Sequence, residues 1–452
     1  MISKVEGGGF VKKISFCKNI QMSYQWLRHR NKICNFPYLP YETIRNFQIE
    51  KIKKIVSDAY NYIPFYKELY SSVEVDPKNI NSFSDFEKLP TISKSDIVGK
   101  ESLLIDKRYD NKDLICSKTS GTSGMFLDIF CDMDMFATEE LQVIRMIKEL
   151  YPNYNSFSRE VLVYTSKYPV ASMLGFYRAY YVNNLKSAEY IFNFILDKKP
   201  SVLAIYPSIL NEIIKTIKFD FNKLNLKLII TNSEQSTQQE RALFSKLFGC
   251  MVIDEFSSEE LQSIAYQCEH YNYHEVSDCT VIEILSLDSD KPVCIGEVGE
   301  ITGTCLINKA MPLIRYRQGD LAVRCKNECM CGKNTPIIGQ PIGRNNSSFI
   351  SINGNIIPSG RLLDWSYSLV LKHNFPISEF QIVQEDLCKV NIYIKTNDTS
   401  DELLSSVKGA FVEIFGNDFA INVVPVPELK KTASGKLIPI LSKVDKNNMI
   451  TI

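Results

Sequence analysis

Apolar runs of strand length alternate with helix-length patterns along the middle of the chain, and this alternation limits the folds open to it. Strands are predicted at residues 161–164, 202–206 and 226–230, with helical patterns at 209–217 and 237–248. Strands that alternate with helices form largely parallel sheets with crossover helices. The sequence therefore predicts an α/β fold, and ligands are expected at the carboxyl ends of its strands.

The regions on either side predict other kinds of structure. Residues 41–70 carry apolar residues at helical spacing, which predicts an N-terminal helix. Short apolar runs with Gly-rich turns at 281–323 predict a β-rich subdomain, and a compact α+β domain is expected after Gly343-Arg344. A chain of 452 residues exceeds the usual size of a single core. We therefore expect a large domain over residues 1–342 and a small C-terminal domain over 343–452.

Composition narrows the classes of partner. Lys plus Arg and Asp plus Glu number 52 each, so no net field draws the surface to nucleic acid or to an anionic membrane. No stretch is long and apolar enough to span a bilayer, and residues 1–20 lack a continuous signal-peptide core. Thirteen cysteines spread through a large chain fit a reducing cytosol better than a disulfide framework. These features predict a cytoplasmic protein with small polar ligands.

A hydroxyl-rich loop occupies residues 117–124, where Ser and Thr alternate with Gly121 and Gly124. Glycines let backbone N–H groups approach an anion closely, and the hydroxyls add further donors. The loop therefore suits a polyphosphate cradle, although the same residues also suit a flexible turn. No Lys follows Gly124, so it is not the GxxxxGK[ST] phosphate loop, and the neutralising charge must come from elsewhere.

Three distant segments follow this loop in order: Glu255-Phe256-Ser257-Ser258-Glu259, residues 314–321 and Ala433-Ser434-Gly435-Lys436. With the loop, their order and spacing resemble the adenylate-forming superfamily of acyl-CoA synthetases. Arg315-Tyr316-Arg317 and Cys329-Met330-Cys331-Gly332 look most like the phenylacetate-CoA ligase branch, especially its capsule-biosynthesis-type members.

This resemblance implies a fold and a reaction. The fold is a large N-terminal domain with mostly parallel sheets and a β-rich subdomain, followed by a small mobile α+β domain. The reaction is attack of a carboxylic acid on ATP, which gives an acyl adenylate and pyrophosphate, followed by transfer of the acyl group to coenzyme A. Partners would be the acid, ATP, Mg²⁺ and coenzyme A, and a homodimer is compatible with the resemblance.

Residue roles follow from the same resemblance. Lys436, Glu259 and Arg344 would be catalytic, with Glu259 near Mg²⁺, a hard cation that suits carboxylate oxygens. The residues implied in ATP binding are Thr119, Ser120, Gly121, Thr122, Ser123, Gly124, Ser233, Glu234, Gln235, Phe256, Ser257, Ser258 and Asp320. Each also has an ordinary interpretation: a solvated charge for Glu259 and Lys436, a core side chain for Phe256, a turn cap for Asp320 and a surface ion pair for Arg344.

The chain departs from the family pattern at two places. Met125-Phe126 stands where this branch commonly has a Lys after the second glycine, which puts part of the phosphate contact in doubt. Asn345-Asn346 stands where the hinge is usually Asp or Lys. Asn tolerates unusual backbone dihedrals, so Asn346 is the expected hinge.

A structural zinc site is also expected. Cys268 and His274 precede the pair Cys329 and Cys331, as a similar Cys and His pair does in related sequences. Three Cys and one His form a closed tetrahedral zinc set. The other interpretation is four ordinary core residues, and His270 would replace His274 if that side chain faced away.

Three functions remain open at this point. The first is an acyl-CoA ligase. The second keeps adenylation but transfers the acyl group to an amine or a hydroxyl in polysaccharide or cofactor biosynthesis. The third is a nucleotide-binding regulator without turnover, which the retention of Glu259, Asp320 and Lys436 disfavours. The acid's pocket is expected between Tyr164 and Phe256, with Tyr206, Pro207 and Ser208 as candidates after a strand.

Overall fold

The computed structural model describes residues 16–73, 76–118, 127–164, 172–344, 348–350, 356–357, 359–377, 379–415, 419–430 and 437–444. The chain divides into two compact units. The large unit holds Met1–Ser233, Phe244–Gln318 and Val323–Gln340, and the small unit holds Glu234–Leu243, Gly319–Ala322 and Pro341–Ile452.

Helices of the N-terminal region precede the main sheet. They are α1 (Phe16–Asn35), α2 (Tyr41–Tyr62), α3 (Pro64–Ser72), α4 (Phe83–Phe86) and α5 (Lys94–Ile97). The single helix predicted over 41–70 is two helices, because Ile63 takes an extended conformation and Pro64 begins α3. Proline restricts the residue before it to such conformations and suits the first position of a helix.

One sheet of twelve strands runs through the molecule. Its order is β11-β12-β13-β14-β10-β9-β8-β7-β6-β4-β5, with β1 (Ile92–Ser93) paired to β13. Its other strands are β4 (Arg159–Tyr164), β5 (Arg178–Asn183), β6 (Val202–Ile205), β7 (Leu228–Thr231), β8 (Met251–Ser258), β9 (Gln262–Gln267), β10 (Tyr273–Glu275), β11 (Thr280–Leu285), β12 (Val298–Cys305), β13 (Tyr316–Arg324) and β14 (Ile337–Arg344). A separate hairpin pairs β2 (Ile115–Lys118) with β3 (Asp128–Cys131).

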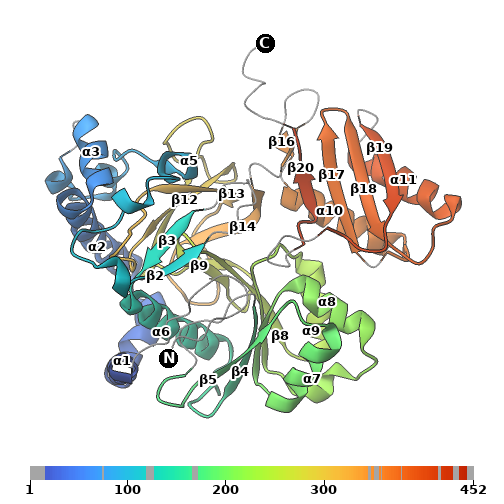
Figure 1. Cartoon of the computed structure of the whole chain (residues 1–452), viewed down its shortest axis with the longest axis horizontal. Helices are drawn as coiled ribbons and strands as arrows, with labels where there is room; N and C mark the ends of the chain where they lie inside the picture. The colour runs from blue at the N-terminus through green and yellow to red at the C-terminus, as the bar shows by residue number, and fades with distance from the viewer. Residues whose placement is uncertain are drawn as a thin grey trace. The chain divides into compact units, whose positions relative to one another are not determined.

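The predicted parallel sheet is confirmed between β5 and β8. The pairs β4–β5, β4–β6, β6–β7 and β7–β8 are all parallel. Alternate residues of these strands pack in one apolar core with α7 (Ala188–Lys198), α8 (Pro207–Thr216) and the end of α9 (Gln238–Phe248). Helix α6 (Met133–Leu150) lies on the opposite side of the sheet from α7 and α8 (Figure 1).

From β8 onward the neighbouring strands run antiparallel. The pairs β8–β9, β9–β10 and β10–β14 are all antiparallel. Arg315 and Arg317, part of the sequence signature, hold this half together. Arg315 is fully buried and lies 2.8 Å from Glu283, and Arg317 lies 2.8 Å from Glu300. Both guanidinium groups therefore form ion pairs with neighbouring strands, Arg315 with β11 and Arg317 with β12.

The small unit has a four-stranded sheet in the order β19-β18-β17-β20. Its strands are β17 (Glu379–Asp386), β18 (Lys389–Lys395), β19 (Ala420–Pro425) and β20 (Ile440–Ser442), and a hairpin pairs β15 (Phe349–Ile350) with β16 (Ile356–Ile357). Helices α10 (Ser359–Lys372) and α11 (Asp401–Phe415) share one core with these strands. The α/β fold is thus as predicted, with a large domain and a small α+β domain, and the predicted parallel sheet and β-rich region are joined in one mixed sheet.

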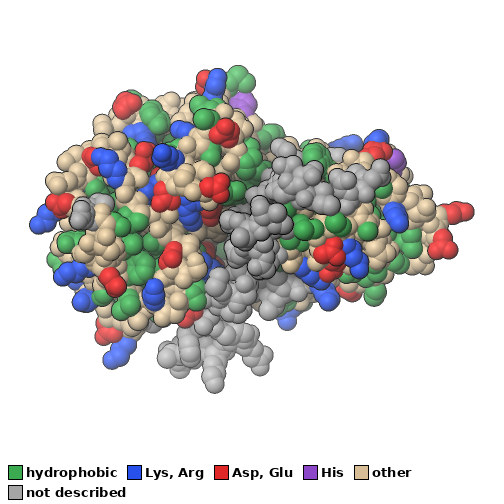
Figure 2. Space-filling view, turned by 90° about the horizontal axis from the view of Figure 1, so that it is seen from above, with side chains coloured by type: hydrophobic (Ala, Val, Ile, Leu, Met, Phe, Trp, Pro, Cys, Tyr) green, Lys and Arg blue, Asp and Glu red, His purple; other side chains and the backbone are tan. Residues whose placement is uncertain are grey.

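The surface in Figure 2 intersperses Lys and Arg with Asp and Glu over the face it displays, as the balanced composition predicts. In the part of the chain described here, no helix is long and apolar enough to cross a membrane. All thirteen cysteines fall within the described residues, and each is a free thiol.

Candidate functional site

The turn between β8 and β9 brings two distant motifs together. Glu259 lies in this turn and is exposed, and its carboxylate accepts a hydrogen bond from the hydroxyl of Ser117. Ser117 lies on β2, the strand that leads into the hydroxyl-rich loop. Residues 119–124 themselves lie outside the described residues. The carboxylate expected near Mg²⁺ is therefore next to the start of the expected phosphate loop.

The neighbouring Glu260 has a different environment. Its side chain is buried, its Oε1 accepts from the Tyr316 hydroxyl at 3.4 Å, and Lys94 Nζ lies 4.0 Å away. Since Glu260 is enclosed and partnered while Glu259 is open, the two adjacent carboxylates have separable structural surroundings. This distinction was not visible in the sequence.

The residues expected around the nucleotide lie at the end of β8, on β13 and in the turn after β7. Ser257 and Ser258 end β8, where the pairing with β9 shifts register after Phe256. Ser258 Oγ donates to Gln318 Oε1 at 3.3 Å. Asp320 is a largely buried residue of β13.

The polar turn after β7 holds Ser233, Glu234 and Gln235. Ser233 has φ of +64°, which is rare for a residue with a side chain. Gln235 Nε2 is buried with no hydrogen-bond partner. Strained backbone and unsatisfied buried donors gather at ligand sites, which fits the role expected of this turn.

Three further residues cannot be placed. Arg344 ends β14, but its side chain lies outside the described residues, as do Asn346 and Lys436. Their catalytic and hinge roles stay predictions.

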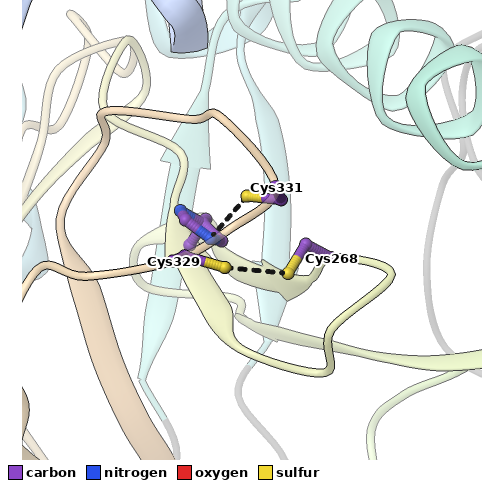
Figure 3. A group of neighbouring side chains, drawn as sticks. Cys268, Cys329 and Cys331 are labelled. Atoms are coloured by element: carbon purple, nitrogen blue, oxygen red, sulfur yellow. Dashed lines mark hydrogen bonds between the residues drawn. The ribbon is translucent and has the colours of Figure 1, made fainter.

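The four predicted metal ligands come together in the large unit. Their ligand atoms all lie within 4.8 Å of one another. Cys268 Sγ lies 3.6 Å from Cys329 Sγ, and Cys331 Sγ lies 3.2 Å from His274 Nε2. Figure 3 shows the three cysteine side chains converging from two strand connections. Two sulfurs bound to one tetrahedral zinc at about 2.3 Å would be roughly 3.8 Å apart, so the group fits zinc in size.

The strands explain this convergence. Cys268 follows β9 and His274 lies on β10, while Cys329 and Cys331 lie in the connection from β13 to β14, which pairs with β10. Gly332 closes the Cys-x-Cys turn with φ of +80°, a conformation that L side chains rarely adopt. His274, and not His270, supplies the imidazole of the group.

Neighbouring groups prepare these side chains for a cation. Burial, with the nearby Lys333 ammonium, lowers the pKa of His274 to about 4, so the imidazole is neutral and can offer a lone pair. The His270 N–H donates to Cys268 Sγ at 3.4 Å, and Asn272 Nδ2 donates to Cys329 Sγ at 3.2 Å. Burial raises the pKa of Cys268 and raises that of Cys331 to about 12, and the bond from His270 opposes this rise at Cys268. At Cys329 the hydrogen bonds outweigh burial and lower the pKa, which favours the thiolate that binds metal.

A second group of polar residues had no assigned role in the sequence. Asn232 after β7 has hydrogen bonds with Glu255 on β8 and with Tyr164 at the end of β4, and Glu255 lines one small cavity of the large unit with Gln142 on α6. Glu255 was quoted as part of a motif, but only the fold shows which elements face it.

Comparisons with known proteins agree with this geometry. No family model matches the chain. Phenylacetate-coenzyme A ligase of Thermus thermophilus is 24% identical over 343 residues, covering 71% of this chain and 75% of the relative. The enzyme of the same name from Escherichia coli is 22% identical over 306 residues, covering 62% of this chain and 67% of the relative.

Solved structures share the fold. A 2-hydroxyisobutyryl-CoA ligase in the postadenylation state has a TM-score of 0.75 at 15% identity, covering 92% of each chain. A benzoate CoA ligase from Burkholderia xenovorans has a TM-score of 0.52 at 15% identity, covering 74% of this chain and 69% of that one. The chain therefore has the α/β fold of the adenylate-forming ligases. In sequence, the chain is related at a distance to the phenylacetate-coenzyme A ligases.

Proposed function

We propose that the protein activates a carboxylic acid with ATP and transfers the acyl group to coenzyme A. The hydrogen bond from Ser117 to Glu259 carries this proposal, because it joins two motifs that are 142 residues apart. The carboxylate of the acid attacks the α-phosphate of ATP and pyrophosphate leaves. The thiol of coenzyme A then attacks the acyl carbonyl, and AMP leaves.

The roles of the residues follow from what each side chain can do. Thr119 to Gly124 would hold the β- and γ-phosphates, and Asp320 would accept hydrogen bonds from the ribose hydroxyls. Phe256 and the Ser233-Glu234-Gln235 turn would contact adenine. Mg²⁺ held near Glu259 would neutralise charge on the leaving pyrophosphate. Lys436 and Arg344 would act on the charge that develops at the α-phosphate.

The small domain, proposed to begin at residue 343, would turn about Asn346 between the two half-reactions. Lys436 would be withdrawn once the adenylate has formed, and a different face of the small domain would receive the acceptor.

Zinc is proposed at Cys268, His274, Cys329 and Cys331 as a structural ion. Four protein ligands leave no open position for a substrate or water. The ion would tie the β9–β10 hairpin to the β13–β14 connection and would take no part in catalysis. This Cys and His set is also what supports placing the chain with the capsule-biosynthesis-type members, and the free thiols support a cytoplasmic location.

Pyrophosphate exchange and AMP release test the proposal in turn. The purified protein should exchange labelled pyrophosphate into ATP when its acid is present. Release of AMP should then accelerate on addition of coenzyme A. If an amine or hydroxyl acceptor accelerates release and coenzyme A does not, the second transfer is to that acceptor. Absence of exchange across a broad panel of acids would contradict adenylation.

A further inference from the structure

The carboxyl ends of the parallel strands form a polar hollow in the large unit. Asn232, which follows β7, donates from Nδ2 to the Tyr164 hydroxyl at 2.5 Å, and Tyr164 ends β4. The rings of Tyr164 and Tyr206 have their centroids 6.0 Å apart. Glu255 lies where β8 leaves β7 and pairs with β9. This is the region in which α/β sheets bind ligands and in which the acid's pocket is expected.

Carboxyl groups gather at Glu255. The residue keeps partial contact with solvent, yet burial raises the pKa of its carboxyl to about 7. The carboxylates of Glu139 and Asp254 raise that pKa further, against one hydrogen bond from Asn232 that lowers it. Among the residues that the structure describes, the groups that act on this carboxyl do not include a cation.

Unsatisfied acceptors lie around the same carboxylate. Oδ1 of Asn232 and Oε1 of Gln142 are both buried with no hydrogen-bond partner, and the two residues are 4% and 8% exposed. A cavity of about 10 Å³ lies beside Glu255, and its lining is part polar and part apolar: Gln142, Glu255, Ser263 and Tyr266 with Val143, Met146 and Val276. A cavity of this size holds one group about as large as a water molecule. Gln142 Oε1 and the Glu255 carboxyl are therefore acceptors at a space for one small donor, and Asn232 is a hydrogen-bond partner of the same carboxyl.

An ammonium group matches these features. It carries three N–H donors and no acceptor, has a positive charge, and is about the size of water. A methyl or aromatic C–H group would leave the acceptors and the carboxylate without partners, which is costly in a desolvated site. A bound water would satisfy the acceptors but would not stabilise the ionised form of Glu255, as a cation would.

We propose that the acid activated by this protein carries an ammonium group, which is held by Glu255 with Asn232 and Gln142 as further acceptors. This inference rests on the proposed adenylation and names the substrate class of the same site. Glu255 directly precedes Phe256, the residue proposed to face adenine, so the ammonium would be bound next to the nucleotide. The preferred acids would then be zwitterionic, unlike phenylacetate or benzoate.

Matched pairs of acids test the proposal by pyrophosphate exchange. Alanine is paired with isobutyrate, β-alanine with butyrate and γ-aminobutyrate with pentanoate, so that each pair differs by an ammonium in place of a methyl group. At least one ammonium acid should show a kcat/KM about 10²-fold or more above that of its methyl counterpart. For that acid, Glu255→Gln should lower kcat/KM by about 10²-fold or more, because it removes the charge opposite the ammonium.

Two controls separate the possible failures. Glu42→Gln changes an exposed glutamate of α2 and should leave exchange unaltered. Glu255→Gln should unfold at the same or a higher temperature than the wild type, because it removes a desolvated charge. Equal or better exchange with the methyl acids, or an equal effect of Glu255→Gln on both members of a pair, would overturn the inference and leave adenylation intact. Failure of every acid in every pair, and of a broad panel besides, would overturn the proposed function and this inference with it.

Discussion

Lys333 Nζ lies 2.6 Å from Glu149 Oε2, and both side chains are buried. Lys333 follows the turn that holds Cys329 and Cys331, while Glu149 lies in the last turn of α6. The Tyr266 hydroxyl donates to the same carboxylate oxygen at 2.7 Å, and the Lys333 ammonium lies 4.4 Å from the centre of the Tyr266 ring. One buried ion pair thus joins the expected zinc turn to the helix that carries Gln142.

Breaking this pair should be costly. Lys333→Met leaves Glu149 buried with only the more distant Arg145, whose Nε lies 3.7 Å from Oε1, as a cation, so the free energy of unfolding should fall by about 3 kcal/mol in urea denaturation. Lys53→Met is the matched control, since it removes an exposed ion pair with Glu50 and should cost less than about 1 kcal/mol. Adding Glu149→Leu to Lys333→Met should recover part of the loss. Equal losses for Lys333→Met and Lys53→Met would show that the buried pair has no structural role.

Metal content tests the zinc proposal. Protein prepared without chelator should contain about one zinc per chain, and Cys329→Ser should lower both the zinc content and the unfolding temperature, because metal binding contributes to folding. Cys388→Ser alters an exposed cysteine and should change neither quantity. A wild-type protein without zinc, together with an unchanged unfolding temperature in Cys329→Ser, would leave the group as ordinary core residues.

Two adjacent carboxylates allow a direct test of the magnesium position. Glu259→Gln should slow pyrophosphate exchange by about 10²- to 10³-fold with little effect on unfolding, because the side chain is exposed. Glu260→Gln should act mainly on stability, since that carboxylate is buried beside Tyr316 and Lys94. The reverse pattern, with exchange lost and folding unchanged in Glu260→Gln, would move the metal role to Glu260.

Local patterns were sufficient for much of the fold. The apolar run at 161–164 lies in β4, and the helical pattern at 209–217 falls almost wholly within α8. The pattern at 41–70 was wrong in one respect, because helical spacing continues across Ile63-Pro64 while the backbone does not. Periodicity records which face is buried and carries little information about a break between two helices that bury the same face.

The two candidate sites differ in how much of each could be predicted from the sequence. The Cys and His group was predictable because its chemistry depends on residue types that the resemblance already paired. The hollow at Glu255 was not, because it requires α6 and three strand ends to face one another. The sequence around Glu255 does not reveal its spatial neighbours, because Asn232 and Gln142 are 23 and 113 positions away.

The buried Glu160 predicts a specific pH dependence of stability. Burial raises the pKa of its carboxyl from 4.5 to about 7, against a hydrogen bond from the Tyr154 hydroxyl that lowers it. Because the folded value is the higher one, this contribution to stability is complete below pH 4.5 and is lost as the pH rises through about 7. As the pH rises from 5 to 8, the free energy of unfolding of Glu160→Gln should therefore increase by about 2 kcal/mol relative to that of the wild type.

Urea denaturation at several pH values measures this gain. Glu68→Gln, a change at an exposed glutamate of α3, is the matched control. A constant difference for Glu160→Gln would contradict a raised pKa.

Lys436 provides the test of the two half-reactions. Adenylation develops charge on the α-phosphate and on the attacking and leaving oxygens, so one preplaced ammonium should act mainly in that transition state. Lys436→Ala should slow adenylation by at least about 10²- to 10³-fold, by analogy with loss of a single oxyanion donor. ATP binding should change much less, because Asp320 and the hydroxyl-rich loop would still hold the nucleotide.

The matched control is Lys430→Ala, which changes an exposed lysine six positions earlier. The Lys436 variant should still process acyl adenylate supplied ready-made, since the rotated small domain would no longer use this lysine. Single-turnover assays of each half-reaction decide the matter, and equal losses in both would assign Lys436 to general binding or structure and defeat the two-conformation mechanism.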